Sequence, residues 1–458
     1  MLDISPSDPK KLPYVSPLPL HAQARLLSVF FGDRLAMLTR FAEYGGDLSR
    51  FRFGSRYVVL VNEAKAVGEV LLDREEDYHK GPALSVYSRP LLGNGLLTSE
   101  GDFHRKQRRL SSPAFAHKRI ISYAAPMAEA GERIQASWKT GDTINVSHEM
   151  MRLTLGIVGK TLFDVDNMEN EADVLGRSLT AIMHYFIRVV RAPIRMFSAT
   201  VPPWERDARK SLEHLNRTIY RLIDARRREE RDTGDLLSML ILAHDPDDDS
   251  DTGMESRQIR DEVMTLFLAG HETTANALTW TWYLLAKHPE IYARLQQEVD
   301  SVLCGKTPTY DDLERLPFTL KVLKESMRLC PPVYALVRQA VKETQIAGHR
   351  IPRKAIVLFA PYLLHRRPDY FPNPDVFDPE RWTDDFEKTR PRYAYLPFGG
   401  GPRLCIGAAF AQMEGHLLLA TLAQRVTFSL PSHDYKAVPE PLITLRPKGG
   451  LNLVVTRR

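Results

Sequence analysis

The sequence contains only three cysteines and no long hydrophobic run. Cys304, Cys330 and Cys405 are too few and too far apart in 458 residues for a disulfide framework, and sparse cysteine is typical of a reducing compartment. The best apolar run near the start, residues 26–31, is interrupted by serine and is far shorter than the roughly 20 residues that span a membrane. We therefore expect a cytoplasmic protein with a proline-rich N-terminal segment, residues 1–31, and with neither a signal peptide nor a transmembrane anchor.

A large excess of charge of one sign is also missing. The net charge is +5, with 26% charged and 43% hydrophobic residues, which is ordinary for a globular protein and excludes a fibrous or disordered chain. No dense lysine and arginine run carries the interleaved aromatic residues of a nucleic-acid interface. The chain also has no Gly-x-Gly-x-x-Gly unit and no set of four cysteines, so we expect neither a flavin segment nor an iron–sulfur cluster.

The most informative stretch is residues 398–407, Phe-Gly-Gly-Gly-Pro-Arg-Leu-Cys-Ile-Gly. Its glycines allow a tight loop, because glycine adopts positive φ without steric cost. Cys405 lies where the loop enters a helical pattern, so backbone N–H groups and the positive end of the helix dipole favour a thiolate there. A buried structural cysteine is the simplest interpretation of a lone Cys near glycines. The full spacing Phe-x-x-Gly-x-Arg-x-Cys-x-Gly is much more specific than that.

A second informative stretch lies in a long helical pattern over residues 256–287, about 48 Å at 1.5 Å per residue. Its apolar middle contains Ala-Gly-His-Glu-Thr-Thr at residues 269–274. Glu272 must be paired or hydrated there, because an unpaired charge in an apolar core is costly. His271 and Glu272 begin like the zinc motif His-Glu-x-x-His, but Ala275 stands where the second histidine is required, which excludes that motif.

Two further groups of polar residues have helical spacing. His104 and Arg108 are four residues apart and share a helix face, which in isolation predicts a solvated basic surface. Glu325 and Arg328 are three residues apart and would in isolation form a surface ion pair contributing under about 1 kcal/mol. Downstream, Arg381 stands in the segment Pro-Glu-Arg-Trp.

These four motifs, spread over residues 104–407 in the chain order that the family has, resemble the cytochromes P-450, the haem-thiolate monooxygenases. The resemblance covers essentially the whole chain, and one small departure is Trp382 where the family has Phe. It implies a mainly α fold with a small β region, in a single domain over residues 1–458. It also implies a haem b between the helix at 256–287 and the helix that follows Cys405.

The resemblance assigns roles to individual residues. Cys405 would be the iron ligand, Gly270 would leave room for dioxygen, and Glu272 and Thr273 would supply and direct protons. The residues expected to hold the haem are His104, Arg108, Arg338, Phe398, Arg403 and Gly407. Glu325, Arg328 and Arg381 would form a buried structural network. The substrate pocket would be lined by Leu84, Val86, Tyr87, Ala269, Ala335, Leu336, Leu442 and Ile443.

The implied function is insertion of one oxygen atom from O2 into a hydrophobic substrate such as a long-chain fatty acid or a terpenoid. Electrons would come from a separate ferredoxin or flavodoxin with an NAD(P)H-dependent reductase. A peroxide-driven peroxygenase and a non-enzymatic haem gas sensor or ligand carrier are the alternatives, and the Glu272-Thr273 pair argues against both. Arg56 and Tyr57 resemble the pair that meets the substrate carboxylate in fatty-acid-hydroxylating relatives, the alternative being solvated strand residues.

Local patterns predict the remaining elements. Aromatic and β-branched residues around Gly54 predict a hairpin over residues 51–61, followed by a helix over 63–72. Residues 81–97 are expected to form an apolar loop. The pattern from 118 to 230 is mostly helical, with breaks expected at Pro126, Gly141, Pro193 and Pro202. The acidic residues 244–253 lack the spacing of a calcium loop and predict a solvated linker.

Overall fold

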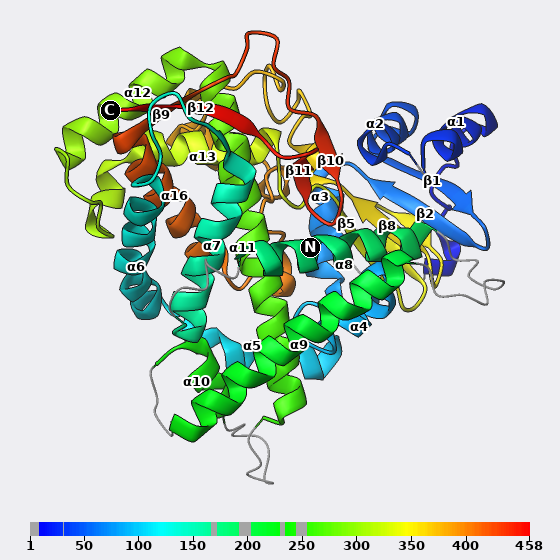
Figure 1. Cartoon of the computed structure of the whole chain (residues 1–458). Coiled ribbons are helices and arrows are strands. Elements are labelled where there is room, and N and C mark those ends of the chain that lie inside the picture. Colours follow the sequence, from blue (N-terminus) through cyan, green and yellow to red (C-terminus); the bar gives the residue numbers. More distant parts are fainter. Residues whose placement is uncertain (1–8, 31, 166–171, 192–202, 230–233, 244–253) are drawn as a thin grey trace. The chain divides into compact units, whose positions relative to one another are not determined.

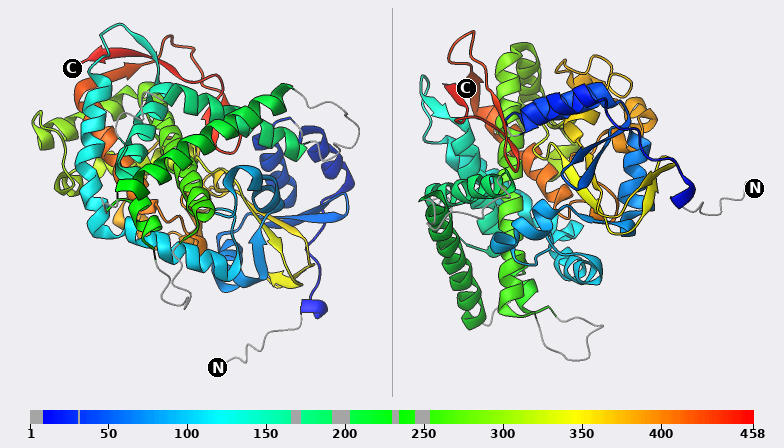
Figure 2. Two further views of the ribbon diagram at one scale, coloured as in Figure 1. Left: turned by 60° about the horizontal axis from the view of Figure 1, so that its bottom comes forward. Right: turned by 90° about the vertical axis from the view of Figure 1, so that its right-hand side faces the viewer.

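The computed structural model describes residues 9–30, 32–165, 172–191, 203–229, 234–243 and 254–458. The chain forms two compact units, and each is assembled from segments that are not contiguous in the sequence (Figures 1 and 2). Unit 1 comprises residues 1–86, 328–376 and 383–405, and unit 2 comprises residues 87–327, 377–382 and 406–458. The single domain over residues 1–458 stays a prediction. The predicted acidic linker and the breaks at Pro193 and Pro202 lie outside the described residues.

Unit 1 is built on a five-stranded sheet of order β1-β2-β8-β5-β3. Its strands are β1 (Leu48–Phe53), β2 (Arg56–Val61), β8 (Ile356–Phe359), β5 (Leu336–Ala340) and β3 (Tyr78–Lys80). The β1–β2 hairpin turns at Gly54, whose φ of +59° favours glycine. β2 then pairs in parallel with β8, where Val59 lies opposite Val357. Both valines belong to the apolar core of this unit, together with Leu71 and Phe359.

The helices and remaining strands of unit 1 surround this sheet and its core. They are η1 (Pro9–Lys11), α1 (Leu20–Phe30), α2 (Arg34–Gly45), α3 (Ala64–Gly68), η2 (Glu69–Asp73), η3 (Glu75–Asp77), η4 (Ala83–Tyr87, ending at the boundary), β6 (Thr344–Ile346), β7 (His349–Ile351), α14 (Pro361–Leu364), α15 (Asp384–Thr389), η9 (Arg392–Ala394) and η10 (Gly401–Arg403). Glu63 caps α3, because its carboxylate accepts from the N–H groups of Lys65 and Ala66. The helix predicted over 63–72 is thus present as α3 continued by η2.

Unit 2 is mostly helical. Its helices are α4 (Arg89–Leu92), α5 (Gly101–Ser111), η5 (Ser112–Phe115), α6 (His117–Gln135), α7 (Val146–Phe163), α8 (Ala172–Arg191), α9 (Pro203–Glu229), α10 (Leu236–Ile241), α11 (Ser256–Lys287), α12 (Pro289–Leu303), η7 (Asp311–Arg315), α13 (Pro317–Leu329, ending across the boundary), η8 (Pro379–Arg381) and α16 (Ala408–Arg425). Its strands are β4 (Thr143–Asn145), β12 (Asn452–Arg457) and β9 (Val426–Ser429) in one sheet, and β10 (Pro439–Pro441) and β11 (Leu445–Pro447) in a hairpin. The mainly α fold with a small β region is confirmed.

The axis of unit 2 is the long helix α11, which begins and ends at the predicted residues, 256 and 287. α7 and α16 pack beside it (Figure 1). Between Ile259 and Leu285, every residue of α11 is buried except Ala269, Gly270 and Thr273. A helix buried on nearly all sides needs an apolar sequence all round, as its middle has. The three accessible residues are within one turn of each other and so lie on one face of α11.

The break predicted at Pro126 is wrong. Helix α6 continues through this proline from His117 to Gln135. An interior proline costs a helix about 3 kcal/mol, because it removes a hydrogen bond and its ring crowds the preceding turn. Tyr123, Ala124, Met127 and Ala128 are all buried around it, and the burial of this helix face offsets the cost.

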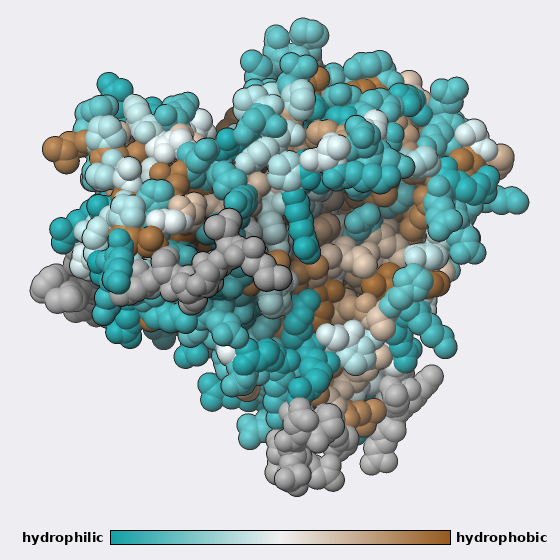
Figure 3. All heavy atoms as spheres, turned by 180° about the vertical axis from the view of Figure 1, so that it is seen from behind, coloured by the Kyte–Doolittle hydropathy of each residue, from teal (hydrophilic) through white to brown (hydrophobic). Residues whose placement is uncertain are grey.

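The surface of the molecule is largely polar where Figure 3 shows it. Hydrophilic residues predominate on that face, and the hydrophobic ones are gathered in smaller groups between them. Among the described residues, no helix is both long enough and apolar enough to cross a membrane.

Candidate functional site

The cysteine loop of unit 1 is held in a tight, defined shape. Gly399 and Gly401 have φ of +74° and +65°, which L side chains rarely adopt. A Cβ at Gly401 would also lie 1.8 Å from the carbonyl oxygen of Leu71, so only glycine fits. The N–H of Cys405 donates to the carbonyl oxygen of Phe398 at 3.0 Å, which closes the loop. Cys405 itself is exposed.

The helix that follows the cysteine begins as the sequence predicts. α16 starts at Ala408 with Gly407 as its N-cap, three and two residues after Cys405. The unpaired N–H groups and the dipole of such a helix start favour an anion nearby. The sequence therefore places an accessible thiol just before a helix N-terminus, which is the setting expected of a thiolate ligand.

Two arginines of unit 1 were predicted to bind haem propionates. The Nε of Arg403 donates to Oε1 of Glu75 at 2.9 Å, and this largely buried ion pair fixes the guanidinium beside the cysteine loop. Arg338 on β5 is 9% exposed, and its guanidinium carbon lies 5.9 Å from the ring centroid of Phe359. Both positions suit a fixed cation, and their role toward a cofactor stays a prediction.

The basic residues of α5 in unit 2 fall into an inner and an outer set by burial. His104 is 5% exposed and Arg108 is half-buried one turn later, so both lie on the inner face of the helix. Arg105 is exposed instead and forms an ion pair with Asp102. The helix therefore has the solvated basic surface that a local interpretation expects, but His104 and Arg108 are turned away from it. Their binding to a propionate stays a prediction.

The accessible face of α11 carries small residues and a hydroxyl. Ala269 is exposed, and Gly270 and Thr273 are half-buried. The hydroxyl of Thr273 donates to the carbonyl oxygen of Ala269 at 2.8 Å, which leaves its oxygen able to accept. A Cβ at Gly270 would lie 3.1 Å from the Val158 side chain of α7, a tight contact that this glycine avoids. This contact says nothing about dioxygen, so the role of Gly270 in leaving room for it stays a prediction.

Glu272 is buried and paired, as a glutamate in this helix must be. It is 2% exposed, and its Oε1 accepts a hydrogen bond of 2.5 Å from the hydroxyl of Thr444. Burial raises the pKa of Glu272 above its ordinary value, and the Thr444 hydrogen bond and the charge of Arg446 oppose part of that shift. The carboxyl therefore holds a proton more readily than an exposed glutamate does.

The neighbouring His271 is a structural residue. Its Nδ1 lies 2.7 Å from the carbonyl oxygen of Phe267, one turn earlier, and its ring is buried. Burial lowers the pKa of His271 to about 4, so the ring is neutral at physiological pH. Among the described residues, no group of three or more His, Cys, Asp or Glu side chains is placed to hold a metal ion.

The predicted pocket residues fall on both units and are described separately. In unit 1, Val86 is 58% exposed and Leu84, Ala335 and Leu336 are half-buried. In unit 2, Leu442 is 8% exposed and Ile443 is half-buried at the tip of the β10–β11 hairpin, while Ala269 lies on α11. The side chain of Tyr87 lies outside the description. Contact of these residues with a substrate stays a prediction.

Two acids that the sequence analysis missed fasten the 93–96 loop to α11. Asp261 Oδ2 accepts from the N–H of Asn94 at 2.8 Å, and Glu262 Oε2 accepts from the N–H of Leu96 at 2.9 Å. Both carboxylates are buried. The only sequence signal was two adjacent acids at the edge of an apolar helix, and nothing local indicates their partners. The backbone of the 93–96 loop is thus fastened to α11 at two points.

Two members of the predicted structural network, Glu325 and Arg381, form an ion pair in unit 2, and the part of Arg328 in that network stays a prediction. Glu325 is fully buried and accepts from Arg381 Nε at 2.9 Å, from the N–H of Asp378 at 3.0 Å and from Trp382 Nε1 at 3.1 Å. The departure from Phe to Trp at 382 adds one of these hydrogen bonds. In unit 1, Arg328 donates to the carbonyl oxygens of residues 365, 374 and 376, which fixes that loop.

A further buried acid, Glu414 on α16, was also missed. It is 0% exposed, and neither carboxyl oxygen makes a well-formed hydrogen bond with the described residues. Burial raises the pKa of Glu414 to about 8, and the neighbouring Thr274 hydroxyl opposes part of that shift. The carboxyl is therefore mostly protonated at neutral pH.

This acid predicts a pH dependence of stability. The folded state keeps the Glu414 proton up to a pKa of about 8, whereas the unfolded chain releases it near 4.5. Stability due to this group is therefore lost as pH rises through that window, by about 1.4 kcal/mol per pH unit. Urea unfolding between pH 5 and 8 should show this loss for the parent relative to Glu414→Gln. Glu314→Gln, at an exposed acid, is the control, and equal slopes for parent and Glu414→Gln would contradict the assignment.

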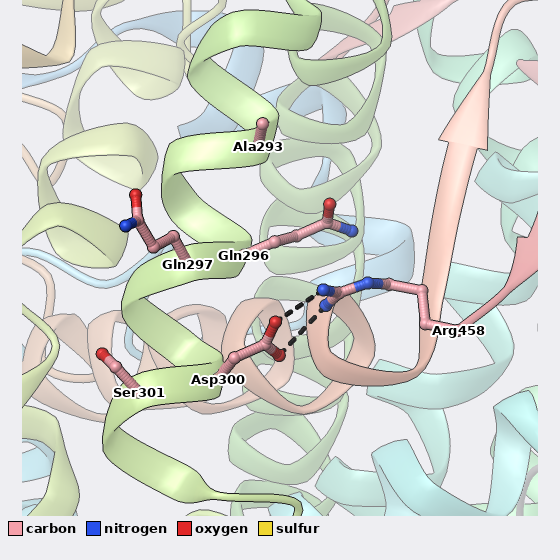
Figure 4. A pocket seen from close by; sticks show the side chains of 6 residues that line it. All are labelled: Ala293, Gln296, Gln297, Asp300, Ser301 and Arg458. Carbon is pink, nitrogen blue, oxygen red and sulfur yellow. Dashed lines mark hydrogen bonds and ion pairs between the residues drawn. The ribbon is translucent and has the colours of Figure 1, made fainter.

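A shallow surface pocket lies on α12, apart in the sequence from the predicted site residues (Figure 4). It is lined by Ala293, Gln296, Gln297, Asp300, Ser301 and Arg458, and Arg458 forms an ion pair of 2.6 Å with Asp300 across it. An ion pair this exposed contributes about 0–1 kcal/mol. The pocket contains no group suited to oxidation chemistry, and we assign it no role.

Comparison with known proteins identifies the family of this chain. The family profile described as Cytochrome P-450 matches residues 8–454. "Cyclooctatin synthase" of Streptomyces melanosporofaciens is 38% identical over 89% of this chain and 86% of its own length, and "Cyclooctat-9-en-7-ol 5-monooxygenase" of the same organism is 35% identical over 83% and 82%. Among solved structures, the "cytochrome P450DA heme domain" is similar with a TM-score of 0.85 and 28% identity over 98% of both chains. This chain therefore belongs to the cytochrome P-450 family of haem-dependent, oxygen-incorporating oxidoreductases.

Proposed function

We propose that this protein inserts one oxygen atom from O2 into a cyclic terpenoid, with Glu272 and Thr273 as its proton-handling groups. The observation that carries this proposal is the single accessible face of α11, where Thr273 stands beside Ala269 and Gly270 in an otherwise buried helix. Small side chains on that face leave room for a bulky apolar molecule, and a hydroxyl next to a buried acid suits proton transfer.

The residues present fit a haem, which we propose to be haem b. Cys405 is accessible before a helix start, which suits an iron-ligating thiolate. The basic side chains of His104, Arg108, Arg338 and Arg403 suit the propionates. When bound, the haem supplies the activation of dioxygen.

The chain's own task is then to deliver protons. Glu272 holds a proton more readily than an ordinary glutamate because it is buried, and Thr273 follows it on the accessible face of α11. The Thr273 oxygen can accept a hydrogen bond while its proton is directed to Ala269. This pair favours a monooxygenase over a peroxide-driven peroxygenase, which receives its oxygen already protonated, and over a gas sensor.

A Thr273→Ala variant is expected to bind haem normally and to lose most of its coupling. Alanine is a better helix former than threonine, so the fold is not expected to suffer. Loss of the hydroxyl should lower product formed per NAD(P)H by about tenfold or more, within the range of positioned proton transfer, with hydrogen peroxide released instead. Thr273→Ser, which keeps the hydroxyl, is the control. Unchanged coupling in Thr273→Ala would assign proton direction to another group such as Thr274.

A neutral terpenoid fits better than a fatty acid for a geometric reason. Arg56 and Tyr57 are adjacent on β2, and successive strand residues point to opposite faces of a sheet. Tyr57 packs against the core of unit 1, with the Arg50 guanidinium 4.6 Å from its ring centroid. The two side chains thus do not converge on one carboxylate. The relative named for 5-monooxygenation of cyclooctat-9-en-7-ol supports the same choice.

The test compares a cyclic terpenoid alcohol, a fatty acid and its methyl ester by the haem spectral shift that each causes. We expect the terpenoid to bind most tightly and the acid and its ester to bind equally. Tighter binding of the acid that is lost in Arg56→Ala would overturn the choice of substrate. Turnover should require a ferredoxin or flavodoxin with its NAD(P)H-dependent reductase, and equal turnover with peroxide alone would favour the peroxygenase. The choice of redox partner and the cytoplasmic location stay predictions.

A further inference from the structure

We propose that Thr444 is a positioning residue that fixes the Glu272 carboxyl and ties it to the β10–β11 hairpin, so that the hairpin controls proton delivery. The inference rests on the proposed function, in which Glu272 supplies protons. Thr444 lies far from α11 in the sequence, and no motif marks it.

The donor and the acceptor of each side-chain hydrogen bond of Thr444 can be assigned. The Nδ2 of Asn276 donates to the Thr444 hydroxyl oxygen at 3.1 Å, and that hydroxyl lies 2.5 Å from Glu272 Oε1. An amide nitrogen can only donate, so the single hydroxyl proton of Thr444 is left for Glu272. Glu272 and Asn276 are one helical turn apart and hold the threonine between them. All three side chains are at most 4% exposed, so water does not compete for these contacts.

Thr444 also belongs to the tip of the hairpin. The N–H of Leu442 donates to the carbonyl oxygens of Glu440 and Thr444, at 3.1 and 3.0 Å, which makes the tip one compact turn. Trp280 Nε1 donates to the carbonyl oxygen of Leu445 at 3.0 Å and anchors the strand that follows. The backbone of Leu442 is therefore linked to Thr444 by a hydrogen bond, and a shift of this tip would be passed to the Thr444 hydroxyl against α11.

The charges near this contact come from the hairpin and α8. Arg446 on β11 acts on Glu272 through its charge, and it is itself paired with Glu440 at 3.1 Å. Its guanidinium also approaches His184 of α8, with Nη2 and Nε2 3.5 Å apart. His271 on α11 and Glu414 on α16 are further buried titratable groups, and His271 is neutral at physiological pH. Loss of the Thr444 hydroxyl removes a contact that favours the ionised carboxylate, so the pKa of Glu272 should rise further.

The experiment is an infrared titration of the haem-loaded enzyme, with Glu272→Gln identifying the carboxyl band. We expect Thr444→Val to raise the pKa of that band by about one unit, a tenfold gain in proton affinity, because a hydrogen bond to a charged group is lost. Thr444→Ser keeps the hydroxyl and should titrate like the parent. Asn276→Ala removes the opposite contact and should shift the band in the same direction, which keeps the test available if Thr444→Val does not fold.

Coupling is measured on the same variants. Thr444→Val should lower the product formed per NAD(P)H, and Thr444→Ser should restore it. A band that titrates alike in the parent, Thr444→Val and Asn276→Ala would overturn the positioning role, as would a Thr444→Ser variant that behaves like Thr444→Val. A shifted band with unchanged coupling would instead overturn the proton-donor function of Glu272, and with it the control by the hairpin.

Discussion

A Cys405→Ser variant is expected to lose monooxygenase turnover and the thiolate-type spectrum of the reduced carbon monoxide complex. A serine hydroxyl stays protonated at neutral pH and is a poor iron ligand, whereas a thiol beside a helix start ionises readily. The side chains are close in size and Cys405 is exposed, so the loop itself should fold. The measurement is the difference spectrum after dithionite reduction under carbon monoxide, followed by turnover with a redox partner.

The two other cysteines provide matched controls. Cys304 is exposed just after α12, and Cys330 is half-buried just after α13. Cys304→Ser and Cys330→Ser should keep both the spectrum and the activity of the parent. If one of them lost both signals while Cys405→Ser kept them, the iron ligand would have to be reassigned.

A Glu325→Ala variant is expected to lose about 3–5 kcal/mol of unfolding free energy, because it leaves a buried arginine without its counter-charge. The carboxylate accepts three hydrogen bonds, and the side chains of Glu325 and Arg381 are 0% and 6% exposed. The loss is measured by urea unfolding followed through tryptophan fluorescence, in which Trp382 itself takes part. At this size of effect, much of the protein should also fail to retain haem during purification.

Glu380, the residue before Arg381 in η8, provides the control. Glu380 forms ion pairs with Arg294 and Lys321, but its side chain is 43% exposed. Glu380→Ala should therefore cost under about 1 kcal/mol, because water replaces the lost partners. Similar losses in the two variants would mean that burial does not set the strength of the Glu325 network.

The sequence predicts elements well where a periodic pattern decides the structure. The bounds of α11 agree at both ends, and the hairpin around Gly54 is present, because each has an unbroken period and clear end signals. The break predicted at Pro126 is wrong because burial of the surrounding helix face outweighs the local preference of proline to end a helix. The helix is kept by contacts that the local sequence does not display.

The candidate site shows the same limit more sharply. Because Glu272 stands in an apolar helix, the sequence predicts that it has a polar partner. The partner, Thr444, is 172 positions away, and no pattern in the sequence identifies it. Arg403 and Glu75 pair across 328 positions, and Asp261 reaches a backbone N–H 167 positions away. Spacing within a motif identifies chemistry that one loop or helix provides. Pairs made between distant segments follow from the folded chain alone.

The two carboxylates that fasten the 93–96 loop leave its side chains free to vary. Asp261 and Glu262 bind backbone N–H groups, which every residue except proline provides. The side chains of Asn94 and Leu96 are therefore not needed for this anchoring. Gly93 and Gly95 are both needed for it. A Cβ at Gly93 would lie 2.0 Å from the Asp261 carboxyl, and a Cβ at Gly95 would lie 2.3 Å from the Thr265 hydroxyl. A library that randomises residues 94, 96 and 97 and keeps both glycines would thus vary the side chains of this loop on an unchanged frame.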